Sequence, residues 1–454
     1  MVVSNFYINR RNFLKSSAAL SALSALGKHG YDLIQSLNTL SVGVIGAGWY
    51  GKNDVLRLIQ VADVEIKAIA DVDSHMAEDA ARIISQRQKS GKVPIIYNDY
   101  KKMLGDHALD IVIIGTPDHW HALSAIDAIK AGANVYLQKP ISVDVLEGEA
   151  ILKVARSHKK IVQIGTQRRS TPHLIEAKKK IVDQGLLGKV AHIEICSYYH
   201  MRFGGDPAIM KVPDHFDYDL WCGPAPKRRF DGLPHRRWRA YMEYGNGIVG
   251  DMCVHMLDTV RWMLDQGWPK QISSTGGIYV QKESNSNITD TQTAIFEYDE
   301  VNVVWTHRTW GRSADPEYPW SFKIYGEKGV LKGDVWKYEF VGNDKTVLKG
   351  DVLLEKDLYP EDNTEKDLEI HAAPATRGHM LDFLKAIKED GKPVADIEEG
   401  LISSASCILA NVALDLSRPV EYDHETRTII GDMEATKLLK RKYRDGYTHP
   451  SWIL

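Results

Sequence analysis

Two consecutive domains of the α/β class are predicted: a Rossmann-type, doubly wound parallel sheet, then an α+β domain with an open, mainly antiparallel sheet. A glycine-rich turn, GAGWYG, directly follows an apolar strand at residues 42–45. Strand-like and helix-like stretches alternate from residue 40 to about residue 165, as in a parallel sheet covered on both faces. Further on, strand-like stretches follow one another without helices between them, which favours an antiparallel or mixed sheet.

Length and composition indicate an ordinary globular protein. The chain has 454 residues, 44% of them hydrophobic and 26% charged, which is enough for two domains. The formal net charge of −3 gives no reason to expect a polyanionic partner, so nucleic acid is not implied. The four cysteines include no CxxC pair and indicate neither a zinc site nor a disulfide framework, although a single bridge stays open.

The first 35 residues differ in kind from the rest and are predicted to be an export signal with its linker. Arg10 and Arg11 precede a weakly apolar stretch at residues 16–26 that has no acidic residue, which is typical of a twin-arginine signal. A frayed amphipathic helix in a cytoplasmic protein is the alternative. No A-x-A cleavage site follows, so a periplasmic and a membrane-tethered protein are both compatible with the signal. Elsewhere no apolar run is long enough to span a bilayer.

The first domain is predicted over residues 36–165, and its glycine-rich turn indicates a dinucleotide site. Gly46 permits the tight turn, Gly48 lets the backbone approach a pyrophosphate, and Gly51 lets the next helix pack closely on the strand. A second strand at residues 64–70 ends in Asp71, 20 residues beyond Gly51 (71 − 51). A carboxylate there accepts from a ribose 2′-hydroxyl and repels a 2′-phosphate, which favours NAD over NADP. The candidate cofactor contacts in this stretch are Gly46, Gly48, Trp49, Tyr50, Gly51 and Asp71.

The remaining elements of this domain bring two further groups to the carboxyl ends of strands, where ligands collect in such sheets. Helices are predicted over residues 76–88 and 121–131, and strands over residues 110–115, 134–137 and 161–165. No third ligand is suggested near His119 and His121, so the loop is expected to wall the nicotinamide pocket and no metal is predicted. The further candidate cofactor contacts are Thr116, Pro117, His119, His121, Gln138, Lys139 and Gln167.

Lys139 is the most specific candidate of the first domain. It lies at a strand end, and Pro140 after it fixes the chain direction. A lysine there binds a substrate hydroxyl and, with a pKa lowered by desolvation, passes a proton. A solvated surface charge is the alternative.

The second domain is predicted over residues 166–454 and carries the substrate candidates Arg168 and Trp238, beside Lys139, Asp251 and His255. A helix is expected over residues 172–185, and an aromatic, cationic loop runs through residues 235–239. That loop suits a polyol, since sugar rings stack on tryptophan and hydroxyls suit arginine, or it is structural.

Asp251 and His255 lie four residues apart on a predicted helix over residues 250–263, so both are expected on one face. A carboxylate beside an imidazole raises the pKa of the histidine and gives an acid/base pair near neutral pH. An ion pair on the helix surface is the alternative.

Strands at residues 277–280, 292–298, 302–307, 321–325 and 338–341 and helices at residues 376–388 and 397–416 complete the expected second domain.

The motifs together resemble the Gfo/Idh/MocA family of oxidoreductases, through the GAGWYG loop, Asp71, the sequence TPDHWHA at residues 116–122 and the sequence QKP at residues 138–140. The family usually has Glu-Lys-Pro, so Gln138 is a departure that removes a carboxylate beside Lys139. The resemblance implies that Lys139, Asp251 and His255 are catalytic, since the family carries Asp-x-x-x-His on a helix that faces the lysine. It also implies a homo-oligomer, dimer or tetramer, formed through the open sheet.

The function that the resemblance implies is an exported NAD-dependent dehydrogenase acting on a small molecule, a sugar or glycoside. His255, tuned by Asp251, would take the hydroxyl proton while Lys139 holds that hydroxyl. One alternative is a redox-neutral enzyme that keeps NAD bound and cleaves or dismutates glycosides through transient oxidation. The other is a non-catalytic sugar or nucleotide sensor, which would be expected to lack this acid/base set.

Overall fold

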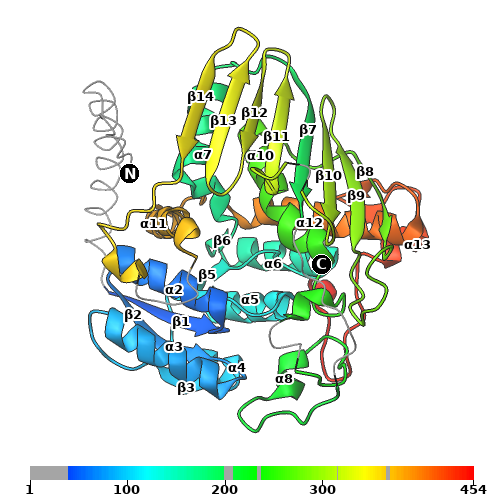
Figure 1. The fold of residues 1–454 in the computed structure, drawn as a ribbon. Coiled ribbons are helices and arrows are strands. Elements are labelled where there is room, and N and C mark those ends of the chain that lie inside the picture. The colour runs from blue at the N-terminus through cyan, green and yellow to red at the C-terminus, as the bar shows by residue number, and fades with distance from the viewer. Residues whose placement is uncertain (1–38, 199–207, 233–236, 314, 364–368) are drawn as a thin grey trace, which may run out of the picture.

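The computed structural model describes residues 39–198, 208–232, 237–313, 315–363 and 369–454 (Figure 1). The predicted export signal lies outside the described residues.

The first domain is built on a parallel sheet of six strands in the order β3-β2-β1-β4-β5-β6. Its strands are β1 (Leu40–Ile45), β2 (Val64–Ala70), β3 (Ile95–Tyr97), β4 (Ile111–Ile114), β5 (Asn134–Leu137) and β6 (Val162–Ile164). Its helices are α2 (Trp49–Val61), α3 (Ser74–Arg87), α4 (Tyr100–Asp106), η1 (Asp118–Trp120), α5 (His121–Lys130) and α6 (Val145–Ser157). The strand order reverses between β1 and β4, which makes their carboxyl ends the expected ligand site.

Helices cover both faces of this sheet because its strands are apolar on both sides. On one face, α2 and α3 bury residues such as Leu58 and Ile84 against β1 and β2. On the other, α5 and α6 bury residues such as Ile126 and Ile151. The doubly wound sheet predicted from the alternating pattern is therefore confirmed.

The second domain contains a mixed, mostly antiparallel sheet of eight strands in the order β14-β13-β12-β11-β7-β10-β9-β8, drawn at the top of Figure 1. Only β7 and β10 run parallel to each other. The strands are β7 (Val190–Ser197), β8 (Gln271–Gly277), β9 (Thr291–Glu297), β10 (Asn302–Arg308), β11 (Trp320–Gly326), β12 (Gly329–Gly333), β13 (Lys337–Gly342) and β14 (Val347–Asp351). A separate two-stranded ribbon joins β15 (Tyr422–Asp423) and β16 (Thr428–Ile429).

The α-helices of the second domain are α7 (Pro172–Ala177), α8 (Tyr218–Cys222), α10 (Val254–Leu264), α11 (Ala373–Glu389), α12 (Ile397–Leu416) and α13 (Met433–Lys437). Two π-helical stretches, η3 (Lys178–Val182) and η5 (Val249–Cys253), continue α7 and precede α10. Short 3₁₀ turns are η2 (Gln167–Ser170), η4 (Trp238–Ala240), η6 (Pro360–Asn363), η7 (Ile370–Ala372) and η8 (Pro450–Ile453).

Two helices of the second domain join the two sheets. The helix α11 packs on α2, and its Phe383 belongs to the apolar cluster of the first domain. The helix α12 packs between α6 and β8. Within the described residues α12 is the one helix long and apolar enough to cross a membrane, but 83% of its apolar window is buried, as in the core helix of a globular domain.

Some predicted boundaries were wrong, and the reasons are physical. The strand expected at residues 277–280 lies earlier in the chain, as β8. Its location was not predicted because its polar side chains obscure the alternation of apolar and polar residues that is typical of a strand. The strand β7 was not predicted, although it alternates buried Ile193 and Ile195 with exposed His192 and Glu194, which is the pattern of a half-buried strand. The helix expected over residues 172–185 is α-helical only to Ala177.

Candidate active site

The glycine-rich turn holds β1 and α2 against β4. Gly46 has a φ of +81°, and a Cβ there would lie 2.7 Å from the backbone nitrogen of Thr116. A Cβ on Gly51 would lie 2.0 Å from the carbonyl oxygen of Gly46. Only glycine fits at these two positions, so the packing of the turn itself requires them.

Gly48 serves no such packing purpose. A Cβ there would meet no atom of the described residues within 4 Å, and Gly48 stands immediately before α2, whose first turn has no side-chain cap. The first backbone N–H groups of that 13-residue helix, together with the helix dipole, therefore face a space that an anion can enter. This cradle fits the pyrophosphate of a dinucleotide.

Asp71 follows β2 and braces the turn. Its Oδ2 accepts a hydrogen bond of 2.7 Å from the N–H of Ala47, and its Oδ1 accepts one of 2.9 Å from the N–H of Asp73. The sequence suggested only a ribose contact for Asp71. The ribose contact stays a prediction, and the carboxylate is fixed beside the turn where that contact requires it.

The loop after β4 is held by its histidines. Thr116 and Pro117 follow the strand, and the imidazole rings of His119 and His121 in this loop are both buried. Nε2 of His119 lies 2.8 Å from the carbonyl oxygen of Trp221. The ring nitrogens of His121 lie 2.6 Å from the carbonyl oxygen of Pro140 and 2.9 Å from that of Thr116. Burial lowers the pKa of each histidine to about 4. These rings connect the loop to the backbone at Trp221 and Pro140. Their contact with a nicotinamide stays a prediction.

Gln138 donates a hydrogen bond of 2.7 Å to Oδ2 of Asp54, on α2. Burial raises the pKa of Asp54 to about 8, so this carboxyl is protonated over much of the neutral range. The carboxylate that the QKP sequence lacks at residue 138 is thus replaced in space by a neutral carboxyl from another element.

Lys139 and Asp251 connect the two domains. Lys139 is 7% exposed, and its peptide bond to Pro140 is cis. Its Nζ donates to Oδ1 of Asp251 at 2.7 Å and to the carbonyl oxygen of Asp251 at 2.8 Å. The ammonium is therefore buried and paired, and the alternative of a solvated surface lysine is wrong.

Arg239 is a second cation on Asp251. Its Nε lies 2.8 Å from Oδ1 of Asp251, and one Nη lies 3.9 Å from Oδ1 of Asp118. Burial alone would raise the pKa of Asp251, but Arg239 and Lys139 lower it below its usual value. Burial raises the pKa of Asp118 to about 7. The cationic run at residues 235–239 was the only sequence signal for Arg239.

His255 does not pair with Asp251 as predicted. Residues 249–253 form a π-helical stretch before α10, and the carboxylate of Asp251 is occupied by Lys139 and Arg239. Burial, with the positive charges of Lys139, Arg168 and Arg239, lowers the pKa of His255 well below its usual value. The predicted rise caused by Asp251 is therefore wrong, and His255 is neutral.

Nδ1 of His255 has no hydrogen-bond partner within the described residues, and the ring meets Trp320 edge to face with centroids 5.5 Å apart. Trp320, at the start of β11, was not singled out from the sequence, because one tryptophan in a strand gives no signal of its position in space.

The other predicted contacts border this centre. Gln167 donates 3.0 Å to the hydroxyl of Tyr50, which donates 3.0 Å to Glu369. Trp49 is half exposed and meets Tyr50 edge to face. The ring of Trp238 stacks under the guanidinium of Arg239 at 3.9 Å from the ring centroid, so its contact with a substrate stays a prediction.

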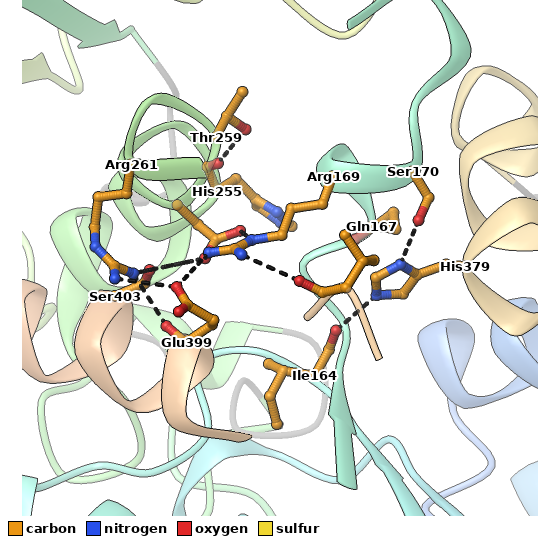
Figure 2. Close-up of polar contacts among 12 residues, drawn as sticks. Ile164, Gln167, Arg169, Ser170, His255, Thr259, Arg261, His379, Glu399 and Ser403 are labelled. Carbon is orange, nitrogen blue, oxygen red and sulfur yellow. Dashed lines mark hydrogen bonds and ion pairs between the residues drawn. The ribbon is translucent and has the colours of Figure 1, made fainter. Parts of the chain in front are cut away.

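Arg168 and Arg169 are adjacent and both buried, but their surroundings differ. Arg169 donates to both carboxylate oxygens of Asp258 at 2.8 Å each and to Glu399 at 2.9 Å; Figure 2 shows this network with Arg261 and Ser403. The guanidinium of Arg168 lies over the ring of Trp320, 5.6 Å from its centroid.

Comparisons with known proteins agree with this arrangement. The profile of an oxidoreductase family with a NAD-binding Rossmann fold matches residues 40–166, and the profile of its C-terminal alpha/beta domain matches residues 172–305 and 356–449. A twin-arginine translocation signal matches residues 8–27. The dinucleotide-binding domain is thus a NAD-binding domain, and the predicted export signal is confirmed.

The individual proteins that this chain resembles have low sequence identity to it. An uncharacterized oxidoreductase of Bacillus subtilis is 25% identical over 392 residues, 84% of this chain and 96% of that protein. An alpha-N-acetylgalactosaminidase of Shewanella oneidensis is 29% identical over 218 residues, 43% of this chain and 47% of that protein. A levoglucosan dehydrogenase solved with NADH and levoglucosan has a TM-score of 0.64 at 17% identity, covering 85% of this chain and 99% of the other.

Proposed function

Since this chain belongs to the Gfo/Idh/MocA family of oxidoreductases, we propose that it transfers hydride between a carbinol of a sugar or glycoside and NAD. The observation that carries the proposal is the position of Lys139. Its ammonium projects from the end of the NAD-binding domain onto Asp251 and lies within electrostatic reach of neutral His255. The three candidates for catalysis therefore come together from two domains.

In the proposed mechanism, Lys139 donates a hydrogen bond to the substrate hydroxyl while Asp251 holds the ammonium in place. His255 accepts the hydroxyl proton at Nδ1, which has no partner within the described residues. Its lowered pKa keeps the ring neutral at physiological pH, so a ring nitrogen has a lone pair for the hydroxyl proton. When bound, NAD supplies the hydride acceptor.

The cofactor would be held by the space at Gly48, the N–H groups of α2 and the carboxylate of Asp71. Asp71 accepts two backbone hydrogen bonds, which favour its ionised form. An ionised carboxylate beside the ribose repels a 2′-phosphate, so we expect NAD rather than NADP.

A second candidate is a redox-neutral reaction in which NAD stays bound and transient oxidation enables cleavage or dismutation of a glycoside. Two observations favour it. The Shewanella relative is an alpha-N-acetylgalactosaminidase, a glycosidase by name. The export signal places the protein outside the cytosol, where free NAD is scarce.

The proposed location is the periplasm, free or tethered by the signal segment. We also expect a homo-oligomer, dimer or tetramer, formed through the open face of the eight-stranded sheet. Alternate residues of β9 and β10 on that face are only partly buried by this chain.

The experiment that tests the proposal starts from protein purified without added cofactor. Denaturation releases any bound nucleotide for mass identification, and the reduced-nicotinamide absorbance of the native protein is followed as sugars and glycosides are added. Accumulation of NADH that requires added NAD indicates a dehydrogenase. Bound NAD that is reduced and reoxidised as aglycone appears indicates the redox-neutral cycle. No change in absorbance with any sugar, with NAD present, contradicts both.

A further inference from the structure

Two of the three guanidinium nitrogens of Arg168 are buried without a hydrogen-bond partner among the described residues. Arg168 is 2% exposed, and its Nε and Nη1 have no partner within the described residues. A buried charge without a partner is strongly destabilising, so proteins keep one where a ligand completes it. Its neighbour Arg169, 5% exposed, has every part of its guanidinium paired (Figure 2). The contrast between the two arginines suggests that Arg168 is kept for a ligand.

The two carboxylates whose charges act on Arg168 do not pair with its guanidinium among the described residues. Glu369 and Asp334 both act on Arg168, but neither forms an ion pair with it among the described residues. Glu369 accepts the hydroxyl of Tyr50. Asp334 accepts the N–H groups of Trp336 and Lys337 at 2.7 and 2.8 Å. Both are committed elsewhere.

Arg168 belongs to the substrate side of the centre. Its guanidinium lies over Trp320, and the same ring meets His255, the proposed base. The positive charge of Arg168 is among the causes of the low pKa of His255. The pyrophosphate cradle at Gly48 and the start of α2 is also near, because Tyr50 in the first turn of that helix acts on Arg168.

Three cations, Lys139, Arg168 and Arg239, act on His255. Lys139 and Arg239 are both paired with Asp251, whereas Arg168 forms no ion pair among the described residues. A substrate that carries a negative charge would pair with Arg168.

We propose that the substrate is a sugar acid, an aldonate or uronate, whose carboxylate accepts hydrogen bonds from Nε and Nη1 of Arg168 while its carbinol faces Lys139 and His255. The inference rests on the proposed function and names the substrate class of that site. A planar guanidinium binds a carboxylate with two parallel hydrogen bonds, which an ammonium cannot do. The pyrophosphate of the cofactor offers similar anionic oxygens, so the test separates the two sources.

The test uses calorimetric titration of the full-length protein loaded with NAD. Two matched pairs serve as probes: D-glucuronate with D-glucose, and D-gluconate with D-glucitol. We expect each acid to bind about ten- to a hundredfold more tightly than its neutral counterpart, as for hydrogen bonds to a charged group. Arg168→Gln should abolish that preference and leave NAD affinity unchanged, and Arg168→Lys should retain part of it.

Three outcomes would overturn the inference: no preference for the acids, no binding of either acid, or a preference that survives in Arg168→Gln while NAD affinity falls. The last result would assign the guanidinium to the cofactor. Hydride transfer to neutral sugars without a preference for acids would overturn the inference and leave the proposed function standing. A folded state of Arg168→Gln is verified by its thermal midpoint, which should change little, because only the contact of the guanidinium with the ring of Trp320 is lost.

Discussion

The ammonium of Lys139 lies 2.7 Å from Oδ1 of Asp251, and this ion pair joins the end of the NAD-binding sheet to the helix that carries His255. A lysine from one domain is thus held in place by a carboxylate from the other. The site exists only when the two domains are packed as they are here.

Lys139→Met should abolish most activity without unfolding the protein. Methionine keeps the length of the side chain, and Asp251 retains its pair with Arg239. We expect kcat to fall by about two to four orders of magnitude, the usual contribution of a group that positions or transfers a proton. Steady-state kinetics measure the loss, with Lys89→Met, an 80% exposed lysine side chain, as control. Full activity of Lys139→Met would remove the lysine from the mechanism.

Gly48→Ala and Gly51→Ala should separate binding from folding. The methyl group of Gly48→Ala meets no atom of the described part of the chain within 4 Å, so we expect stability to fall by no more than about 1 kcal/mol, the loss from a poorer helix cap. NAD affinity should fall at least about tenfold, because the methyl group occupies the pyrophosphate cradle.

In Gly51→Ala, the methyl group would lie 2.0 Å from the carbonyl oxygen of Gly46, so the protein itself should be destabilised. Thermal unfolding and NAD titration of both variants check the pair. Unchanged NAD affinity in Gly48→Ala would place the cofactor elsewhere.

Arg169→Gln should destabilise the protein strongly. It leaves Asp258, which is fully buried, without its bidentate partner, and breaking one side of a buried pair costs about 3–5 kcal/mol. Arg418→Gln is the matched control, since its side chain is 41% exposed and solvent screens its pair with Asp432, which therefore adds little to stability. Equal losses in urea unfolding of the two variants would contradict the importance of the buried network.

Stability should decline as the pH falls from about 6.5 towards 4. Burial lowers the pKa of five histidines to about 4, while the unfolded chain binds protons near the ordinary value of about 6.5. These lowered pKa values stabilise the fold above pH of about 6.5, and that stabilisation is lost on acidification, by about 1.4 kcal/mol per pH unit for each histidine. The five are His119, His121, His173, His307 and His379.

Three buried carboxyls with raised pKa values act in the opposite direction and remove part of this effect: Asp54, Asp118 and Glu147. Above pH of about 6.5 the carboxyls act alone, because both chain states then hold neutral histidines, so stability should also decline towards pH of about 8. A thermal midpoint that stays constant between pH of about 4.5 and 6.5 would contradict the buried neutral histidines.

Local signals in the sequence explain what was predicted correctly. The glycine-rich turn and the alternation of strands and helices indicated the first domain, because both depend on residues close in the chain. The helix α12 was predicted with its observed bounds, since its apolar run is long and Asp396 caps it. The strand β7 was missed although its alternation of buried and exposed residues is itself a local strand signal.

The site was predicted residue by residue, but its pairings were not. The spacing of Asp251 and His255 suggested a contact along the helix, but two cations from other elements occupy Asp251. Asp251 instead pairs with residues 112 and 12 positions away in the sequence (251 − 139 and 251 − 239), which no local pattern can show. Trp320 and Asp54 were not predicted as site residues for the same reason, because tertiary packing alone brings them to the site.

The most direct test of the central claim is a single-turnover experiment with protein loaded with NAD and a sugar deuterated at the carbinol carbon. The wild-type protein should transfer the deuterium to the nicotinamide, where mass spectrometry of the released cofactor detects it. His255→Gln should slow the transfer by about two to four orders of magnitude and leave NAD affinity unchanged. Deuterium that never reaches the cofactor, or an equal rate in His255→Gln, would contradict hydride transfer with His255 as the base.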